Sequence, residues 1–215
     1  MDFVRPSRGV ALELVSGRGH YDSVIRAVMD AKQSVWIATA NLKELMVEDI
    51  RPKMQRRRGL RDSYRSIMDV FDELAQTGVE LKLLHGSLPS RPFREEFDKH
   101  ARLVAGGLDM RMCPRVHLKL VIVDGRHTYM GSANWTGAGL GAKGTGRRNF
   151  EMGMWTTDEG VADDAQMLFD HVWQGAGCYG CKLREECEAP LDGEKPKRKR
   201  EPVRAFVRLR RKLPR

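Results

Sequence analysis

The sequence predicts an α/β fold in which a mixed β-sheet is flanked by helices. Three observations support this class. Segments with helical hydrophobic spacing alternate with short apolar segments, as in proteins that pack helices on a sheet. Two of the apolar segments are separated by the turn pair Asp124-Gly125, which predicts a β-hairpin. The 215 residues, 24.5 kDa, are enough to bury one core.

The first half of the chain is expected to alternate between strands and helices. Two stretches show the three- and four-residue spacing of apolar side chains that is typical of amphipathic helices, and the second is followed by Gly78, a residue type that favours helix ends. Short apolar runs around them are expected to be strands. The expected order is an edge strand at 10–15, a helix at 22–32, a buried strand at 34–40, a helix at 62–76 and a strand at 79–84.

The second half continues this alternation and contains the hairpin. Residues 137–146 are rich in glycine and are expected to form a flexible loop at the rim of a site. All of these elements are assigned to one domain, residues 1–174. The expected order is a helix at 91–104, a short strand at 108–112, the hairpin strands at 116–123 and 127–130, a strand at 150–155 and a helix at 160–173.

The hairpin carries a group of polar residues that is suited to phosphate chemistry. His117 and Lys119 stand two apart in an apolar strand, so their side chains share one face. The second strand of the hairpin leads to Ser132 and Asn134 and returns them beside the first pair. An imidazole, an ammonium, a hydroxyl and an amide would thus meet, which is a set that can hold a phosphate and attack it.

This pattern, H-x-K-x4-D followed by G-S-x-N in a strand–turn–strand context, resembles the signature of the phospholipase D superfamily. The order of elements from about residue 22 to 174 resembles the small, single-motif bacterial endonucleases of that superfamily. The resemblance implies a phospholipase D-like sandwich and the following roles. His117 would be the nucleophile that forms a phosphohistidine, Lys119 and Asn134 would bind phosphate oxygens with help from Ser132, Asp124 would fix the turn, and Glu151 would hold the histidine ring.

The chemistry is reasonable without the resemblance. A neutral imidazole is a competent nucleophile at pH 7, and a covalent intermediate splits one difficult displacement into two. Preorganised Lys and Asn donors stabilise the charge that grows on the phosphoryl oxygens. No cofactor is required for catalysis by this set. The alternative is that His117 is an ordinary half-buried histidine, which the spacing of its five companions disfavours.

The proposed displacement also needs a general acid for the leaving oxygen. Members of the superfamily that the sequence resembles supply it from a second copy of the motif, and this chain carries one copy. A two-fold homodimer would bring two His117 residues together in one composite site. A heterodimer with a related chain is the alternative.

The formal net charge of +9 lies entirely at the C-terminal end. Residues 194–215 contain eleven Lys or Arg and two Asp or Glu, so they are expected to be a basic, disordered tail. Such runs bind polyanions, with nucleic acid, DNA or RNA, expected before anionic membrane. A second basic cluster, residues 51–58, is expected in a loop and could follow a nucleic-acid backbone. The alternatives are a tail that only aids solubility and, for residues 51–58, a plain exposed loop. The candidate nucleic-acid contacts are Arg56, Arg57, Arg58, Lys197, Arg198, Lys199, Arg200, Arg210, Arg211 and Lys212.

Four cysteines form a second candidate site. Cys178-x2-Cys181-x5-Cys187 lies in a Cys-rich extension, residues 175–193, and Cys113 lies four residues before His117. Four thiolates suit one structural Zn²⁺ or one [4Fe–4S] cluster, and spacing does not choose between them. The spacing resembles that of certain iron–sulfur nucleases of bacterial recombination and CRISPR adaptation. The alternative is no metal, with Cys113 as a small buried hydrophobe.

These observations predict a phosphodiesterase that acts as a nuclease. Two other functions stay open. One is a catalytically silent nucleic-acid-binding subunit of a repair or defence complex. The other is a phospholipid phosphodiesterase, which would need an apolar surface to bind the membrane interface. The sequence shows neither a stretch of ~20 apolar residues nor the apolar region of a signal peptide near Met1, so we expect a cytoplasmic protein without a transmembrane segment.

Overall fold

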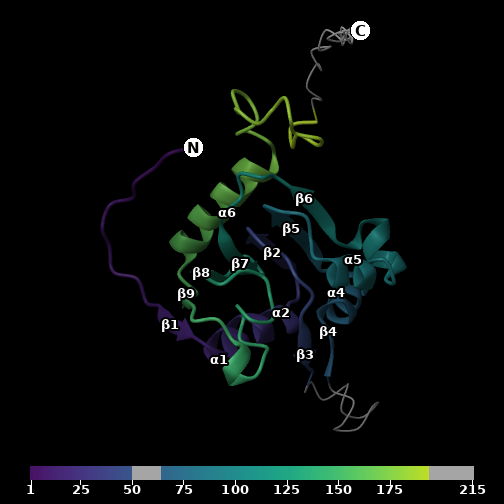
Figure 1. Ribbon diagram of the computed structural model, residues 1–215. Coiled ribbons are helices and arrows are strands. Elements are labelled where there is room, and N and C mark those ends of the chain that lie inside the picture. Colours follow the sequence, from purple (N-terminus) through teal and green to yellow (C-terminus); the bar gives the residue numbers. More distant parts are fainter. Residues whose placement is uncertain (50–63, 194–215) are drawn as a thin grey trace, which may run out of the picture.

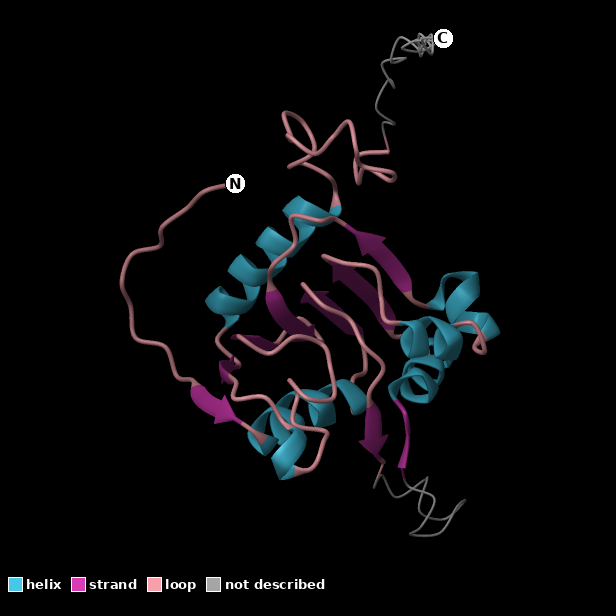
Figure 2. Cartoon of the chain, viewed as in Figure 1, coloured by secondary structure: helices cyan, strands magenta, loops and turns pink. Residues whose placement is uncertain are grey.

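The computed structural model describes residues 1–49 and 64–193. Its centre is a seven-stranded sheet with helices on both faces (Figures 1 and 2). The strand order is β1-β9-β8-β7-β2-β5-β6. Strands β2, β5 and β6 run parallel, and every other neighbouring pair is antiparallel. The predicted α/β class with a mixed sheet is therefore confirmed.

The strands are short and follow the apolar runs of the sequence. A separate pair, β3 and β4, forms a two-stranded sheet. The bounds are β1 Glu13–Ser16, β2 Ser34–Thr39, β3 Met46–Glu48, β4 Tyr64–Ser66, β5 Glu80–His85, β6 Asp109–Met112, β7 Lys119–Val123, β8 His127–Gly131 and β9 Met152–Thr156.

The helices lie in two layers. On one face, α1, a π-helical turn and α2 follow one another without a break and pack beside α4, while α6 covers the opposite face (Figure 1). The bounds are α1 Arg18–His20, the π-helical turn Tyr21–Ile25, α2 Arg26–Met29, α4 Ile67–Gln76, α5 Arg91–Phe97, a second π-helical turn Leu103–Gly107, a 3-10 turn Thr145–Arg147 and α6 Glu159–Trp173.

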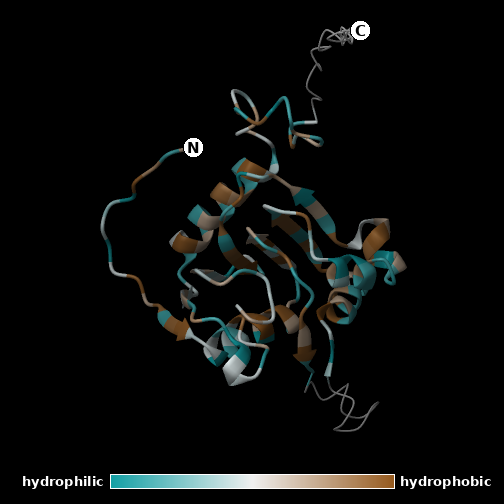
Figure 3. Ribbon diagram, in the orientation of Figure 1, coloured by the Kyte–Doolittle hydropathy of each residue, from teal (hydrophilic) through white to brown (hydrophobic). Residues whose placement is uncertain are grey.

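Strand β7 explains why the core has two layers. Val121 and Val123 face the larger core beneath α2 and α4, whereas Leu120 and Ile122 face α6 and its Phe169. All five side chains are at most 3% exposed, and each such burial contributes about 1.5–3 kcal/mol. Figure 3 shows the matching alternation of hydrophobic and hydrophilic residues along α6. The central strand is therefore held from both sides.

Two of the expected helices were wrong in extent. The helix expected at 62–76 begins at Ile67, because Ser66 is its N-cap and accepts a hydrogen bond from the Met68 amide at 2.9 Å. The residues just before it form β4, an element that the helical spacing concealed. The helix expected at 91–104 ends at Phe97, and the following π-helical turn contains Gly106 at φ 107°. Glycine at positive φ prevents that turn from continuing as regular helix.

The chain ends of the described part lie against α6. Arg5 forms an ion pair of 2.6 Å with Asp164, and Arg8 pairs with Asp158, so the N-terminal segment runs along the outside of the helix (Figure 1). Residues 175–193 follow the helix as a series of tight turns at its C-terminal end. Among the described residues, no helix is both long enough and apolar enough to cross a membrane.

Candidate active site

His117 and Lys119 meet at the start of β7. The strand was expected to span residues 116–123, but it begins at Lys119. His117 therefore lies in the segment that leads into the strand. The Lys119 Nζ lies 3.0 Å from His117 Nδ1 and donates to the His117 carbonyl oxygen at 2.9 Å. The His117 side of this pair is exposed and Lys119 is half-buried. The imidazole is thus accessible, with an ammonium beside it.

Asn134 is held in place by the end of β2. Its Oδ1 accepts the backbone N–H of Asn41 at 3.1 Å and the hydroxyl of Thr39 at 3.3 Å. Thr39 is also the residue opposite Lys119 in the β2–β7 pairing, which brings the asparagine to the same end of the sheet. Because the amide oxygen is engaged by the protein, the amide nitrogen is the group that Asn134 offers to a ligand.

Glu151 and Ser132 form a supporting pair. The Ser132 hydroxyl donates to Glu151 Oε2, and Glu151 Oε1 accepts from Asn149 Nδ2 at 3.1 Å. Ser132 Oγ also accepts the backbone N–H of Met152 at 3.1 Å, which ties the end of β8 to β9. Within the described residues no hydrogen bond joins Glu151 to His117. The role that the resemblance implied, a carboxylate on the histidine ring, differs from this arrangement.

Glu151 instead acts on the site through its charge. Partial burial lowers the pKa of Lys119, and the nearby Glu151 carboxylate opposes that shift. Burial also lowers the pKa of His20, and the Glu151 carboxylate opposes this shift. The His20 ring packs edge-on against Tyr129, with the ring centroids 5.5 Å apart. Glu151 therefore favours the positively charged form of Lys119.

Asp124 lies at the other end of β7, away from His117. It occupies the left-handed region at φ 55° in the turn of the hairpin. Its carboxylate accepts the backbone N–H groups of Lys32, Gln33 and Ser34 at 2.7–3.0 Å. These contacts join the hairpin turn to the start of β2. Of the six residues predicted as a site, Asp124 thus lies in the turn of the hairpin, whereas the other five lie around the opposite end of β7, β8 and β9.

A polar cavity of about 160 Å³ beside Asn134 contains residues that the signature did not point to. Lys43, Lys143 and Asn149 line it together with Glu44. Lys43 follows β2, and its backbone N–H donates to the Trp135 carbonyl at 3.0 Å, so the loop is fixed next to the signature. No periodic pattern in the sequence points to either lysine, because both stand in loops.

The glycine-rich loop forms the rim of this cavity, as expected, but it is tied down along its length. The backbone N–H of Lys143 donates to Gly137 at 3.0 Å, and that of Asn149 donates to Ala138 at 3.1 Å. A side chain at Gly139 would place its Cβ 2.8 Å from the Asn134 carbonyl oxygen. The loop can therefore approach the signature asparagine only because this position is glycine.

The predicted nucleic-acid contacts at Arg56 to Arg58 and in residues 194–215 lie outside the described residues. The four cysteines are inside them. No group of three His, Cys, Asp or Glu within the described part is close enough to hold one metal ion in this structure. The cysteines nevertheless line one common cavity, which is considered below.

The fold and the site define a class of protein: an α/β domain whose central hairpin presents a histidine–lysine pair and an anchored asparagine. Residues 24–173 match the family model described as cardiolipin synthase, PLD-like domain. The match spans well over half of the chain, so the chain belongs to the phospholipase D superfamily. The resemblance seen in the sequence is confirmed. A comparison with curated protein sequences gives no significant match.

Solved structures show the same fold. NucT from Helicobacter pylori is 16% identical with a TM-score of 0.51, and the match covers 75% of this chain and 94% of that one. A phospholipase D family member, Nuc from Salmonella typhimurium, is 17% identical with a TM-score of 0.50, covering 76% and 95%. Polyphosphate kinase from Porphyromonas gingivalis is 14% identical with a TM-score of 0.50, covering 77% of this chain and 26% of that one. At these identities the likeness concerns the fold.

Proposed function

We propose that this protein is a phosphodiesterase that hydrolyses nucleic acid through a covalent intermediate on His117. The observation that carries the proposal is the exposed imidazole with the Lys119 ammonium 3.0 Å from its Nδ1, beside an asparagine whose amide nitrogen is left to face a ligand. In its neutral form an imidazole is a competent nucleophile, and the adjacent ammonium can bind the oxygens of the phosphate that it attacks.

The reaction would proceed in two displacements at phosphorus. A ring nitrogen of His117 attacks, the P–O bond to the leaving group breaks, and a phosphohistidine forms. Water then attacks the same phosphorus, the P–N bond breaks, a proton of the water passes to the group that protonated the leaving oxygen, and the imidazole is restored. Lys119 and Asn134 stabilise the charge on the phosphoryl oxygens in both steps. Enzymes of the superfamily catalyse without a cofactor, and no residue of this site needs one.

Charge near the site supports nucleic acid as the substrate. Lys43 and Lys143 line the cavity next to Asn134, where they can pair with phosphates adjacent to the one being cleaved. The +9 segment at residues 194–215 adds a second polyanion-binding element to the same chain. A single phosphate monoester would leave these additional cations unused, whereas a polynucleotide backbone would engage them.

A second copy of the chain would complete the site. The leaving oxygen needs a proton, and a second His117 across a two-fold axis can supply it. Next to Glu151, an apolar strip on the β1–β9 edge is exposed: Phe150 is fully exposed, Leu14 is 70% exposed and Met152 is 64% exposed. Covering this strip would bury apolar surface beside the two sites. Static light scattering should therefore give twice the chain mass, and a fully active monomer would contradict the pairing.

The exposed strip also gives the lipid alternative a specific observation in its favour, because apolar side chains at the edge of a site can enter a membrane surface. The two occupants predict different results. Leu14→Ser with Met152→Ser should produce a monomer with reduced nuclease activity if a second copy covers the strip. The same variant should lose binding to anionic vesicles, with its mass unchanged, if lipid is the occupant.

The test of the function uses purified full-length protein with EDTA present. Single-stranded DNA, duplex DNA, RNA and phospholipid vesicles are offered separately, and cleavage is followed with end-labelled substrate. His117→Ala should abolish turnover, and His117→Asn, a better isostere of the imidazole edge, is the matched control for folding. Lys119→Ala and Asn134→Ala should each lose about 10²-fold in rate. Equal turnover by His117→Ala and wild type would reject the proposal.

The same wild-type and His117→Ala proteins distinguish an enzyme from a catalytically silent binding subunit. Acid quenching during turnover of a substrate labelled at the scissile phosphate should leave label on the wild-type chain and none on His117→Ala. Binding of nucleic acid without cleavage and without label transfer, on every substrate offered, would favour the silent binding subunit.

A further inference from the structure

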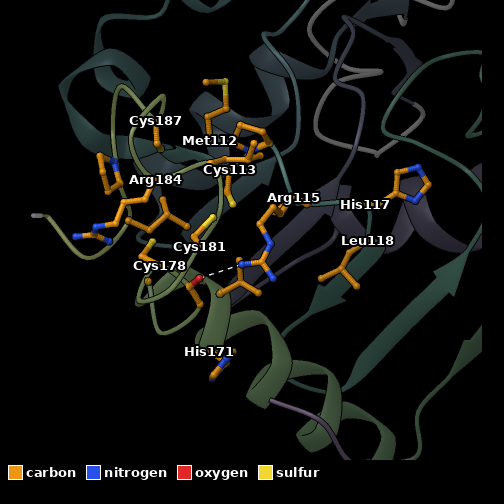
Figure 4. Close-up of a pocket in the computed structure, with 18 of the residues that line it drawn as sticks. Met112, Cys113, Arg115, His117, Leu118, His171, Cys178, Cys181, Arg184 and Cys187 are labelled. Atoms are coloured by element: carbon orange, nitrogen blue, oxygen red, sulfur yellow. Dashed lines mark hydrogen bonds between the residues drawn. The ribbon is translucent and has the colours of Figure 1, made fainter. Parts of the chain in front are cut away.

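Four cysteines surround a single cavity at the C-terminal end of α6. Cys113 lies in the turn between β6 and β7, and Cys178, Cys181 and Cys187 lie in the turns that follow the helix. All four line one cavity of about 500 Å³ (Figure 4). All four are free thiols and half-buried. Cys113 is at least 65 positions from the other three cysteines in the sequence, yet all four line the same cavity. Ordinary apolar packing of this region would not need four cysteines in one place.

The cysteine turns supply hydrogen bonds to sulfur. Cys113 Sγ accepts the backbone N–H of Arg115, and Cys181 Sγ accepts the backbone N–H of Leu183, in each case two residues further along the chain. Gly180, at φ 71°, and a hydrogen bond of 3.1 Å from the Cys181 amide to the Cys178 carbonyl close the turn between the paired cysteines. Backbone donors aimed at sulfur stabilise a thiolate, the form that binds metal.

Arg115 connects the two segments. Its guanidinium donates to the Gly177 carbonyl oxygen at 3.0 Å, drawn as the dashed line in Figure 4. It also donates a hydrogen bond to the Cys181 sulfur. The cavity is also lined by His117, two residues beyond Arg115. Whatever fills the cavity therefore holds the C-terminal turns against the segment that carries the nucleophile.

We propose that Cys113, Cys178, Cys181 and Cys187 ligate one [4Fe–4S] cluster that fixes residues 175–193 to the segment before β7. Four thiolates are the complete ligand set of such a cluster. They would equally complete a structural zinc site, but zinc requires all four sulfurs at ~2.3 Å from one point. Here the cysteines are spread around a cavity, and no three of the described metal-binding side chains converge on one point. The cavity of about 500 Å³ leaves room for a centre of several atoms, so the cluster is the occupant that we propose and zinc is the outcome that would replace it.

The centre is structural. With every metal ligand supplied by protein, no position is open for water or substrate, so the cluster takes no part in phosphoryl transfer. The proposal goes beyond the nuclease assignment and does not depend on it. Loss of the cluster should first release residues 175–193 and lower stability, and only then disturb His117.

The test measures metal in anaerobically purified full-length protein. Iron and acid-labile sulfide should each be present at about four per chain, with broad absorption near ~400 nm. Cys113→Ser, Cys178→Ser, Cys181→Ser and Cys187→Ser should each lose most of this signal. Tyr179→Ala is the matched control, because Tyr179 stands between two of the cysteines and is 95% exposed, and it should keep the cluster.

Three results would overturn the proposal. One zinc per chain without iron would replace the cluster by a mononuclear site. Absence of both metals, with four thiols titrating freely in native protein, would remove the site altogether. A cluster that survives Cys113→Ser would separate the C-terminal cysteines from the β6–β7 turn. Because thiol titration is made on the wild-type protein, the test stands even where a variant fails to fold.

Discussion

Replacing Asp124 by alanine should destabilise the domain while leaving the chemistry intact. The carboxylate accepts three backbone N–H groups, from Lys32, Gln33 and Ser34, at 2.7–3.0 Å. Hydrogen bonds to a charged group contribute about 1.5–3 kcal/mol each, and partial exposure of these reduces them to about 1 kcal/mol. Asp124 also tolerates φ 55°, at which alanine costs about 1 kcal/mol more. The expected loss is about 4 kcal/mol, or roughly 8–16 °C in Tm.

The assay is urea unfolding, paired with turnover at a temperature where every variant is folded. Asp124→Asn keeps one carbonyl acceptor and tolerates the same φ, so it should lose about half as much stability as Asp124→Ala. Both variants should retain turnover within a few-fold of wild type, whereas Lys119→Ala should not. An Asp124→Ala protein with unchanged stability and a rate as low as that of Lys119→Ala would refute this reasoning and place Asp124 in the chemistry.

Three other outcomes are expected. Burial raises the pKa of Glu44 to about 7 from 4.5, so its contribution to stability is present below pH 4.5 and is lost as pH rises through 7, by roughly 1–2 kcal/mol once the partial exposure of the side chain is taken into account; Glu44→Gln should flatten that profile in urea unfolding measured from pH 4.5 to 8. Lys43→Ala and Lys143→Ala should raise KM for oligonucleotides and leave kcat nearly unchanged, unlike Lys119→Ala. Deleting residues 194–215 should weaken binding and flatten its salt dependence without changing turnover on saturating short substrates; an intact salt slope would assign the tail another role.

The parts of the fold that the sequence predicted are those in which local pattern and tertiary packing agree. The alternation along β7 identifies its two buried faces because helices cover both sides of that strand. Helix α6 shows its buried face at three- and four-residue spacing for the same reason. Strand β4 was missed because three residues are too few for a period, and its exposed Tyr64 happened to continue the helical spacing of α4.

The positions of the site side chains could likewise be predicted only where they depend on local structure. The hairpin is a local structure, so the meeting of Lys119 with the Ser132–Asn134 turn could be predicted from spacing. The anchoring of Asn134 by Asn41 could not, since these residues are 93 positions apart. The placement of Lys43 in the cavity likewise depends on how a loop after β2 meets a loop after β8. Nothing in the local sequence encodes that meeting.

Two signature residues, Asp124 and Asn134, attach the hairpin to opposite ends of β2. Asp124 binds the backbone at the start of β2, through residues 32–34, and Asn134 binds its end, through Thr39 and Asn41. The strand that carries Lys119 is paired with β2 between these two attachments. Both ends of the hairpin are therefore attached to the same strand, β2. These attachments fix the distance from Lys119 to Asn134. Such rigidity is what preorganised phosphate binding requires.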